Sequence, residues 1–239
     1  MDENLNKEAE KGAEQAPAKK KSKKNRLVIT GVVVAVLVVL GAGFWVWHEQ
    51  PSFCNAICHT PMDPYYDTYA SGEVDRNGNA VANPVGMLAY AHANYSKDGT
   101  EVSHGSGMTC MSCHIPTIGE QVSEAAAWIS GNYVYPLEEK TLDDLVAARG
   151  LSDSTEFCMN DACHSDLRDK TAFVQATAEL SEGRNPHSMP HGTVACTDCH
   201  NAHTVSVNAC SQCHNDSPLP EGWLSTQDYK KVQSSTAKA

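Results

Sequence analysis

The sequence predicts a mostly α-helical protein with extensive loop, in which a single N-terminal apolar helix precedes a cysteine-rich domain. Three observations lead to this fold class. Residues 27–47 are almost entirely apolar, all ten cysteines lie after them, and few long apolar runs occur beyond residue 48. A domain with so little aliphatic sequence needs another source of core, as disulfides or metals provide in small folds.

The apolar segment LVITGVVVAVLVVLGAGFWVW, residues 27–47, has only Thr30 as a polar side chain. As a helix its 21 residues would extend about 31 Å, enough to cross a bilayer. Trp45 and Trp47 lie where the aromatic belt of a membrane protein is expected. The alternative is a cleaved signal peptide, whose apolar stretch is about 7–15 residues long and ends in a small-residue cleavage site. We therefore expect an uncleaved transmembrane signal-anchor.

The anchor divides the chain into regions. Residues 1–26 are polar and contain the basic run KKKSKKNR, which predicts a disordered cytoplasmic tail. The chain after His48 is then outside the cell membrane, on its periplasmic or extracellular face. We expect the exported domain to cover residues 48–220 and a polar C-terminal tail to cover residues 221–239.

The cysteines form five close pairs, and a histidine directly follows the second cysteine of each pair. The pairs are Cys54/Cys58, Cys110/Cys113, Cys158/Cys163, Cys196/Cys199 and Cys210/Cys213, followed by His59, His114, His164, His200 and His214. C-x-x-C-H is the attachment signature of c-type haem, in which two thiols bond the porphyrin and the histidine becomes the proximal iron ligand. Two motifs are longer, CNAICH and CMNDACH, so one or two residues must loop out there.

Zinc sites and disulfide scaffolds also use paired cysteines, but neither needs a histidine directly after the second cysteine. The motifs therefore predict five covalently bound haem c groups. The fold class becomes a single N-terminal transmembrane helix plus a multihaem cytochrome c domain packed around its haems.

Local patterns predict short helices in this domain at residues 120–130, 142–149 and 166–181, the last with Ser165 as N-cap and Gly183 as C′. Residues 71–86 and the chain from Pro218 onward are predicted to be loop and tail. No segment has a convincing strand pattern.

The remaining histidines are candidates for the distal ligand of each iron. His203 follows the fourth motif, His187 and His191 precede it, and His92 and His104 precede the second motif. His48, beside the membrane helix, is expected to be interfacial instead. Met62 follows His59 by three residues in CNAICHTPM and is a candidate ligand of the first iron, with simple loop packing as the alternative.

The part of the chain from residue 27 is strongly acidic. Residues 1–26 hold 8 basic and 5 acidic residues of the totals 18 and 29, which leaves 10 basic against 24 acidic, a balance of −14. This charge disfavours nucleic acid as a partner and suggests a soluble protein with a positive docking face. A solvated acidic surface without a partner is the alternative.

The combination of the anchor, CNAICHTPM, CMSCHIP and CTDCHNAH resembles the NapC/NirT/NrfH family of membrane-anchored multihaem cytochromes. The likeness covers about residues 27–205. The segment NPHSMPHGTVACTDCHNAHTVSVNACSQCH, followed by Trp223, also resembles the haem domain of flavocytochrome c fumarate reductases. The first resemblance implies anaerobic respiratory electron transport from membrane quinol, such as menaquinol, to an exported terminal reductase. The second favours a separate flavoprotein as that reductase.

This sequence departs from the first family in two respects. It has five motifs where many members have four, and no lysine or arginine occurs between Lys97 and Lys140, where family members carry a lysine near the quinol. Glu120, Glu124 or Asn132 are the candidates to replace it. The first haem is the expected electron entrance, with Asp63 or Glu120 as proton acceptor. The alternative function is a multihaem enzyme that reduces a small nitrogen or sulfur compound at an open iron.

Overall fold

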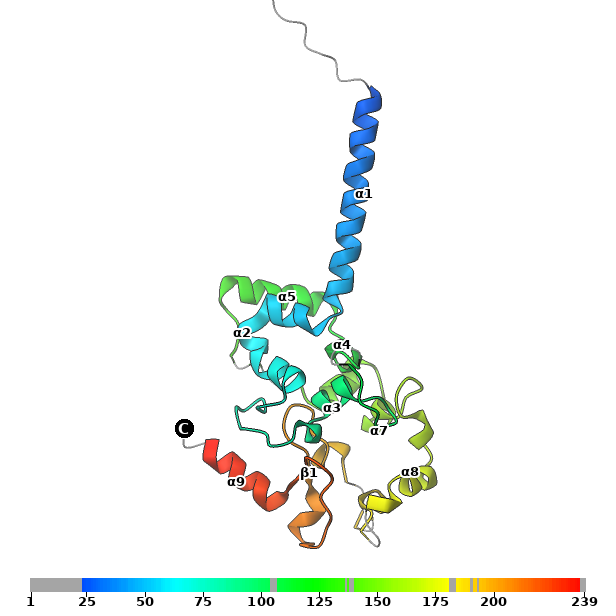
Figure 1. Cartoon of the computed structure of the whole chain (residues 1–239), viewed down its shortest axis with the longest axis vertical. Coiled ribbons are helices and arrows are strands. Elements are labelled where there is room, and N and C mark those ends of the chain that lie inside the picture. Colours follow the sequence, from blue (N-terminus) through cyan, green and yellow to red (C-terminus); the bar gives the residue numbers. More distant parts are fainter. Residues whose placement is uncertain are drawn as a thin grey trace, which may run out of the picture. The chain divides into compact units, whose positions relative to one another are not determined.

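The computed structural model describes residues 23–103, 107–135, 137, 140–180, 184–189, 191–192 and 194–236 (Figure 1). It describes only the backbone of Cys58 and His59. Most of the predicted cytoplasmic tail, His104 and Gly183 lie outside the described residues. The chain forms two units, Met1–Val46 and Trp47–Ala239.

Helix α1, Lys23–His48, carries the apolar segment of the sequence. Its side chains up to Trp47 are exposed, which is unfavourable for valine and leucine in water. It is long and apolar enough to cross a membrane, and near the N-terminus such a helix is a membrane anchor or a signal sequence.

The second unit is mostly helical with extensive loop, as predicted. Its α-helices are α2 Pro51–Ala70, α3 Leu88–Asn94, α4 Cys110–Cys113, α5 Ile118–Ser130, α6 Leu142–Ala148, α7 Ser154–Cys158, α8 Lys170–Ala176 and α9 Thr226–Thr236. Short 3-10 turns are η1 Pro84–Gly86, η2 Ser165–Leu167, η3 Ala178–Leu180, η4 Pro186–Ser188, η5 Cys196–Asp198 and η6 Ala209–Gln212. Two strands of two residues each, β1 Val207–Asn208 and β2 Leu224–Ser225, pair in parallel.

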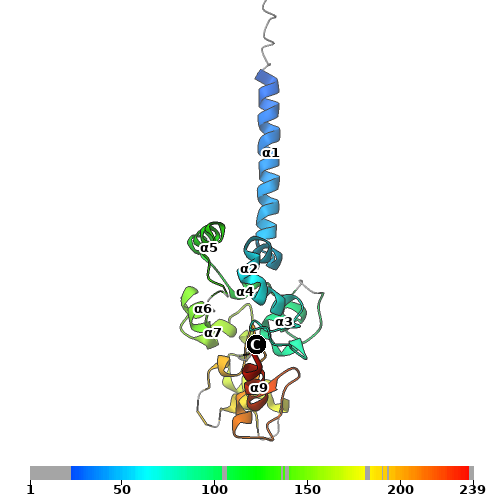
Figure 2. The ribbon, with the colours of Figure 1, turned by 90° about the vertical axis from the view of Figure 1, so that its left-hand side faces the viewer.

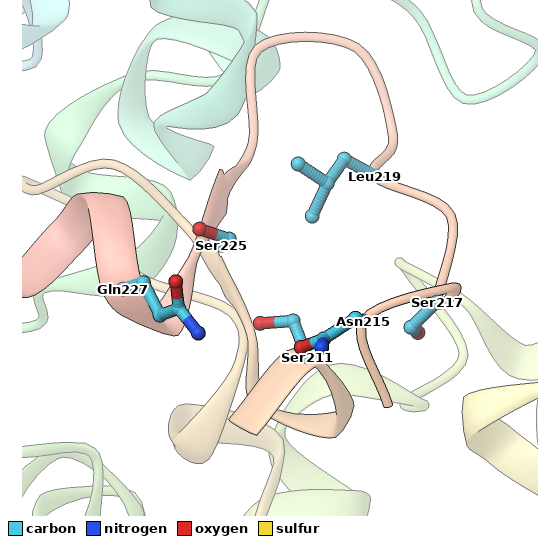
Figure 3. A pocket seen from close by; sticks show the side chains of 6 residues that line it. All are labelled: Ser211, Asn215, Ser217, Leu219, Ser225 and Gln227. Carbon is cyan, nitrogen blue, oxygen red and sulfur yellow. The ribbon is translucent and has the colours of Figure 1, made fainter. Parts of the chain in front are cut away.

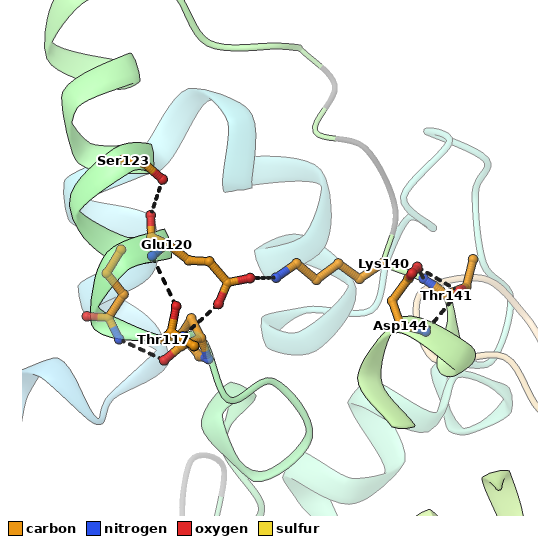
Figure 4. Close-up of polar contacts among 8 residues, drawn as sticks. Thr117, Glu120, Ser123, Lys140, Thr141 and Asp144 are labelled. Atoms are coloured by element: carbon orange, nitrogen blue, oxygen red, sulfur yellow. Dashed lines mark hydrogen bonds and ion pairs between the residues drawn. The ribbon is translucent and has the colours of Figure 1, made fainter. Parts of the chain in front are cut away.

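Two of the expected helices begin with capping boxes, which the close-up in Figure 4 shows. At α5 the Thr117 hydroxyl accepts from the N–H of Glu120 at 3.2 Å, and the Glu120 carboxylate accepts from the N–H of Thr117 at 2.7 Å. Thr141 and Asp144 repeat this arrangement at α6. Each box satisfies two backbone donors that a helix start would leave unpaired. The helices expected at 120–130 and 142–149 are confirmed, with α5 starting two residues earlier.

The helix predicted over 166–181 is wrong as one continuous element. The segment divides into η2, α8 and η3. The reason is local: the Asp169 carboxylate accepts from the N–H of Ala172 at 2.9 Å and starts a new helix in the middle of the apolar pattern. Ser165 makes no N-cap for this helix and instead opens η2.

The prediction of loop and tail from Pro218 onward holds up to Trp223 and is wrong beyond it, because residues 224–236 form β2 and α9. The N–H of Leu224 donates to the carbonyl of Ser206 at 3.0 Å, and the N–H of Ser206 donates to the carbonyl of Gly86 at 2.8 Å. A Cβ added to Gly86 would lie 2.2 Å from the carbonyl oxygen of Gly222. These contacts join the C-terminal segment to the chain around η1.

The core of the second unit contains few aliphatic side chains. Among the described residues, the buried apolar side chains are Pro51, Pro61 and eight others, against nine polar ones, and the fully buried residues include Thr68 and Ser206 beside Met87 and Ala93. Apolar burial on this scale is small for a domain of this length. The structure is therefore consistent with a core in which a bound group supplies much of the apolar surface.

Candidate functional site

The cysteine–histidine motifs lie on helical segments of the second unit. The first motif lies within α2, the second on α4, the third begins at the end of α7, and the last two lie on η5 and η6. In the second, fourth and fifth motifs, the histidine N–H donates to the carbonyl of the first cysteine at 2.8, 2.8 and 2.9 Å. This turn brings both cysteines and the histidine to one side of the chain, as attachment of a single group requires.

The third motif reaches the same closure despite its two extra residues. The N–H of His164 still donates to the carbonyl of Cys158, at 3.2 Å. The extra length forms a small inner turn, in which the N–H of Cys163 donates to the carbonyl of Asn160 at 3.1 Å. The insertion therefore loops out, and the histidine keeps its position relative to the first cysteine.

Cys213, the second cysteine of the fifth motif, differs from the other predicted attachment cysteines. It is exposed, whereas the other cysteines whose side chains the structure describes are half-buried. The polypeptide therefore encloses this thiol less than it encloses the other described cysteines. The cause is local, because Cys213 caps the end of η6, where its N–H donates to the carbonyl of Cys210 at 3.2 Å, and the chain continues into exposed residues at 215 and 216. A haem attached at Cys213 would have one edge open to solvent.

Four motif histidines each face one of the remaining histidines across a similar gap. The ring centroids are 6.3 Å apart for His114 and His203, 6.3 Å for His164 and His92, 6.2 Å for His200 and His187, and 6.0 Å for His214 and His191. An imidazole–metal bond is about 2 Å long, so two rings on opposite sides of one metal have centroids about 6 Å apart. Each pair could hold one iron from both faces.

The tautomer of His203 suits this role. The Thr68 hydroxyl donates to the carbonyl of Tyr65 at 2.7 Å, and its oxygen lies 2.7 Å from Nδ1 of His203. Since the hydroxyl has only one hydrogen, Nδ1–H of His203 is the donor in the second contact. The lone pair of Nε2 is then directed away from Thr68 and is available to a metal.

Two other paired histidines have the same arrangement. Nδ1 of His187 lies 3.0 Å from the Thr177 hydroxyl, which donates to the carbonyl of Phe173 at 3.0 Å. Nδ1 of His92 lies 2.8 Å from the carbonyl of Leu88, which can only accept. In both cases Nδ1 carries the proton and Nε2 is free to bind.

Burial lowers the pKa of five of the paired rings and so favours their neutral form; these are His114, His164, His187, His200 and His203. Burial lowers the pKa of His200 to about 4, with smaller contributions from His187, His92 and His164. Burial also lowers the pKa of His203 to about 4, with His114 and Arg76 adding to the effect. A metal binds the neutral imidazole, so these rings are in the protonation state that ligation requires.

Consecutive motifs lie next to each other along the unit. Burial raises the pKa of the Cys110 thiol to about 11, and the nearby Cys54 of the first motif adds to the shift. Burial and then Cys196 of the fourth motif raise the pKa of Cys158 to about 11. In the same way Cys163 acts on the pKa of Cys113, and Cys210 acts on the pKa of Cys199, in each case after burial as the larger cause. The five motifs thus form a series in chain order.

Arg149 lies beside the second motif, which ends in Cys113 and His114. Its guanidinium donates to the carbonyl of Cys113 at 3.3 Å and stacks over the ring of Phe157 at 4.3 Å. Within the described part of the chain, its buried Nε has no hydrogen-bond acceptor. A buried guanidinium nitrogen normally has an acceptor, and the propionate of a haem at the second motif would provide one. The residues present therefore fit haem.

His48, which was not expected to be a ligand, and Met62 lie outside the four histidine pairs. Nε2 of His48 donates to Oε1 of Gln121 at 3.0 Å, so His48 is engaged elsewhere. Met62 is half-buried in α2, which also contains Pro61 and Pro64. Because the His59 side chain and all of His104 are outside the described structure, the ligands of the first iron stay a prediction.

The fold brings a lysine to α5 that the sequence spacing does not reveal. Nζ of Lys140 lies 3.1 Å from Oε1 of Glu120, so the chain returns to α5 after twenty residues (Figure 4). The bond from the Thr117 backbone, followed by the bond to Lys140, lowers the pKa of Glu120 to about 2. Such a carboxylate is a weak base and so a poor proton acceptor, and the role of Asp63, the other candidate, stays a prediction. Thr68, Thr177 and Arg149 were likewise missed, because they belong to no sequence motif.

A polar pocket of about 220 Å³ lies beside the fifth motif (Figure 3). Its lining residues are Ser211, Asn215, Ser217, Leu219, Ser225 and Gln227. These side chains offer hydrogen bonds but neither an acid nor a base, so the pocket adds no catalytic group to the site.

Comparisons with known proteins agree with the motif geometry. The family model for cytochrome c3 matches residues 144–215, which contain the third, fourth and fifth motifs. The cytochrome c-type protein Cgr1 of Eggerthella lenta is 48% identical to this chain over 209 residues, which cover 86% of this chain and 89% of that protein. No solved structure matches.

Proposed function

Since the chain belongs to the family of multihaem c-type cytochromes that includes Cgr1, we propose that it transfers electrons as a membrane-anchored pentahaem cytochrome. It takes them from a membrane quinol, such as menaquinol, and delivers them to an exported terminal reductase, most simply a separate flavoprotein. Within this proposal the chain is a NapC/NirT/NrfH-type quinol-oxidising cytochrome, whose N-terminus is cytoplasmic and whose haem domain is on the outer face.

The observation that carries the proposal is the set of four facing histidine pairs, with centroids 6.0–6.3 Å apart. In each pair a motif histidine would be the proximal ligand, and His203, His92, His187 or His191 would be the distal one. When bound, haem c supplies reversible one-electron chemistry. Closing both faces of an iron favours electron transfer over reaction at the metal, because no position is left for a substrate.

The series of motifs supports transfer over a distance. Consecutive motifs are close enough for their cysteines to influence each other, from Cys54 and Cys110 at one end to Cys199 and Cys210 at the other. The first motif begins seven residue steps after Trp47, a span of at most about 25 Å. The end of the series near the first motif is therefore confined to the neighbourhood of the membrane exit of α1, where a lipid quinol is available.

The opposite end of the series suits delivery to a partner. Cys213 is exposed, so the edge of a haem attached there would be accessible from solvent. An electron that enters near the first motif would then leave at the fifth, where a soluble reductase can approach.

The ion pair of Lys140 and Glu120 supports a quinol site at the entrance. A cation near the second motif is what the resembling family uses, and here Lys140 reaches α5 from a distant part of the sequence. Burial lowers the pKa of His114, and Lys140 also contributes to this shift, which indicates that Lys140 lies near the second motif. Lys140 would hold the quinol oxygen, and Asp63 would accept its proton.

The alternative enzyme function depends on the first motif. Four of the five motifs have a facing histidine among the described residues, whereas the candidates for the first iron, Met62 and His104, stay predictions. An open position at this iron would allow reduction of a small nitrogen or sulfur compound. We favour electron transfer because the remaining motifs all have two histidines available.

The test is the rate of reduction by a menaquinol analogue in liposomes, measured on the full-length protein. Lys140→Met should slow reduction at least tenfold, while Lys97→Met should leave it unchanged. Lys97 is a matched control, since it is also an exposed lysine paired with a carboxylate, that of Asp166. Met62→Ala should also slow reduction, because a Met ligand raises the potential of an iron. Wild-type rates in both Lys140→Met and Met62→Ala would rule out quinol oxidation at this end.

A further inference from the structure

We propose that helix α5 lies on the membrane surface, where its exposed apolar side chains enter the lipid interface. It would be a second membrane contact, in addition to α1. The inference rests on the proposal that α1 is retained as an anchor, and the experiment below tests the two separately.

Helix α5 has a stripe of large apolar residues that the described structure does not cover. Ile118, Val122 and Ile129 are 81%, 63% and 78% exposed. Their spacings of four and seven residues place them on one face of a helix of 3.6 residues per turn. Single exposed apolar residues are common on protein surfaces, but three aligned on one helix indicate a binding surface.

The apolar surface extends beyond the helix at both ends. Ile115 precedes α5 and is 54% exposed, and Val134 and Tyr135 follow it and are 64% and 58% exposed. The two glutamates of α5 are on the opposite face: Glu120 and Glu124 are two and six residues from Ile118, which turns them well away from the stripe. Figure 2 shows α5 end-on at the margin of the second unit, where α2 is its main packing partner among the described elements.

The position of α5 in the chain fold favours lipid as the partner. His48 is the last residue of α1, and its Nε2 donates to Oε1 of Gln121 on α5 at 3.0 Å. Next to His48, the ring of Trp47 packs edge-on against Phe53 at 5.0 Å. The first turns of α5 are thus fixed beside the residue at which an anchored chain leaves the bilayer, and interfacial aromatic residues surround this point.

The charges of α5 indicate how it would bind. Interfacial helices often use lysines to attract anionic lipids, but this helix contains two glutamates and no basic residue. Glu120 is neutralised by Lys140 at 3.1 Å. Binding would therefore come from apolar insertion alone, and it should depend little on the anionic lipid content of the membrane.

The experiment uses the full-length haem-containing protein in nanodiscs that contain a phospholipid with a photoactivated diazirine in its acyl chain. Labelled peptides are quantified by mass spectrometry. The apolar part of α1 is the positive control within the same chain, and the polar helix α9 is the negative control. We expect labelling of residues 118–135 at no less than one fifth of the α1 level, with α9 at background. Raising the fraction of anionic lipid should change the labelling of residues 118–135 by less than twofold.

The triple variant Ile118→Ser/Val122→Ser/Ile129→Ser should lose at least five-sixths of the α5 labelling and keep that of α1. The matched control Val194→Ser/Leu219→Ser removes two exposed apolar side chains that are not on α5. It should leave the labelling of α5 and α1 unchanged. Should the triple variant fail to fold, the single Ile129→Ser near the helix end should still halve the labelling. Labelling of α1 without labelling of α5 would overturn this inference and leave the anchor intact. The finding that α5 is protected because it is buried in a dimer would have the same consequence. Absence of labelling from both helices would overturn the anchor as well.

Discussion

The imidazole rings of His187 and His200 lie 6.2 Å apart and within 5° of parallel. They are brought together by short local elements, η4 for His187 and the turn after η5 for His200. On the other side of His187, Nδ1 is bound to the Thr177 hydroxyl at 3.0 Å. The protein therefore fixes the separation of two potential ligands and the tautomer of one of them, His187. The function proposed above rests on four histidine pairs with this separation.

The pairing of His114 and His203 predicts the effect of removing one ring. His203→Ala should leave all haem groups attached, because the thioether bonds depend on the cysteines, but should convert one of them from low spin to high spin. The electronic absorption and EPR spectra would report the change. His48→Ala is the control, since Nε2 of His48 is bound to Oε1 of Gln121. An unaltered, fully low-spin spectrum for His203→Ala would show that His203 is not a ligand.

The Thr68 hydroxyl should tune the same site through the Nδ1–H of His203. Thr68 is fully buried, and Thr68→Val keeps its shape but removes the acceptor at 2.7 Å. Losing one hydrogen bond of about 1 kcal/mol makes the imidazole a weaker electron donor and should raise one reduction potential by about 40 mV. A spectroelectrochemical titration measures this shift. Thr68→Ser, which keeps the hydroxyl, should restore the wild-type potential; a shift of equal size in both variants would indicate a packing effect instead.

The close approach of Gly86 and Gly222 makes Gly86 sensitive to any side chain. A Cβ at Gly86 would meet the carbonyl oxygen of Gly222 at 2.2 Å and the carbonyl carbon at 2.7 Å, so backbone must move. Gly86→Ala should lower the free energy of unfolding by about 2–3 kcal/mol. Gly119→Ala is the control, because a Cβ there meets only the Thr117 hydroxyl at 3.8 Å and alanine favours the helix. Thermal unfolding of the two variants would compare them, and equal midpoints would contradict the packing described at η1.

The acidic charge of the exported part predicts a salt effect on its partner reaction. Residues 27–239 carry 10 basic and 24 acidic residues, as derived from the totals of 18 and 29 and the 8 and 5 in residues 1–26. Attraction to a positive docking face speeds association at low salt and is screened at high salt. The rate of electron transfer to the cognate reductase should fall at least tenfold between about 10 mM and 500 mM salt, as stopped-flow mixing would show. A constant rate would reduce the charge to a solubility feature.

Local patterns predicted much of this structure, and tertiary contacts account for the rest. The motifs, α1, α5 and α6 depend on spacing, hydropathy and capping residues that lie close together in the sequence. The set of candidate distal histidines was also readable, but the partner of each was not, because His203 lies next to the fourth motif and faces the second.

Where the structure differs from the prediction, the cause is a contact or a cap that the sequence pattern does not show. Asp169 caps a new helix inside a pattern that looks continuous, and a two-residue strand such as β2 forms only because β1 is there to pair with it. The exposure of Cys213 could not be predicted from its motif, because the motif does not show that the chain after η6 continues through exposed residues. The sequence did not predict a basic group beside α5, because no lysine or arginine occurs between Lys97 and Lys140. The loop that brings Lys140 back to α5 has no local sequence signature.

The central claim is that each of the five motifs binds one haem covalently, and the intact mass of the purified mature protein tests it most directly. After maturation by haem-attachment machinery, the account predicts a single dominant species whose mass equals that of the polypeptide plus five haem groups. Peptide mapping should then find one haem on each cysteine pair, including the longer motifs that start at Cys54 and Cys158 and the pair that contains the exposed Cys213. A mature protein with three or fewer haem groups would contradict the account.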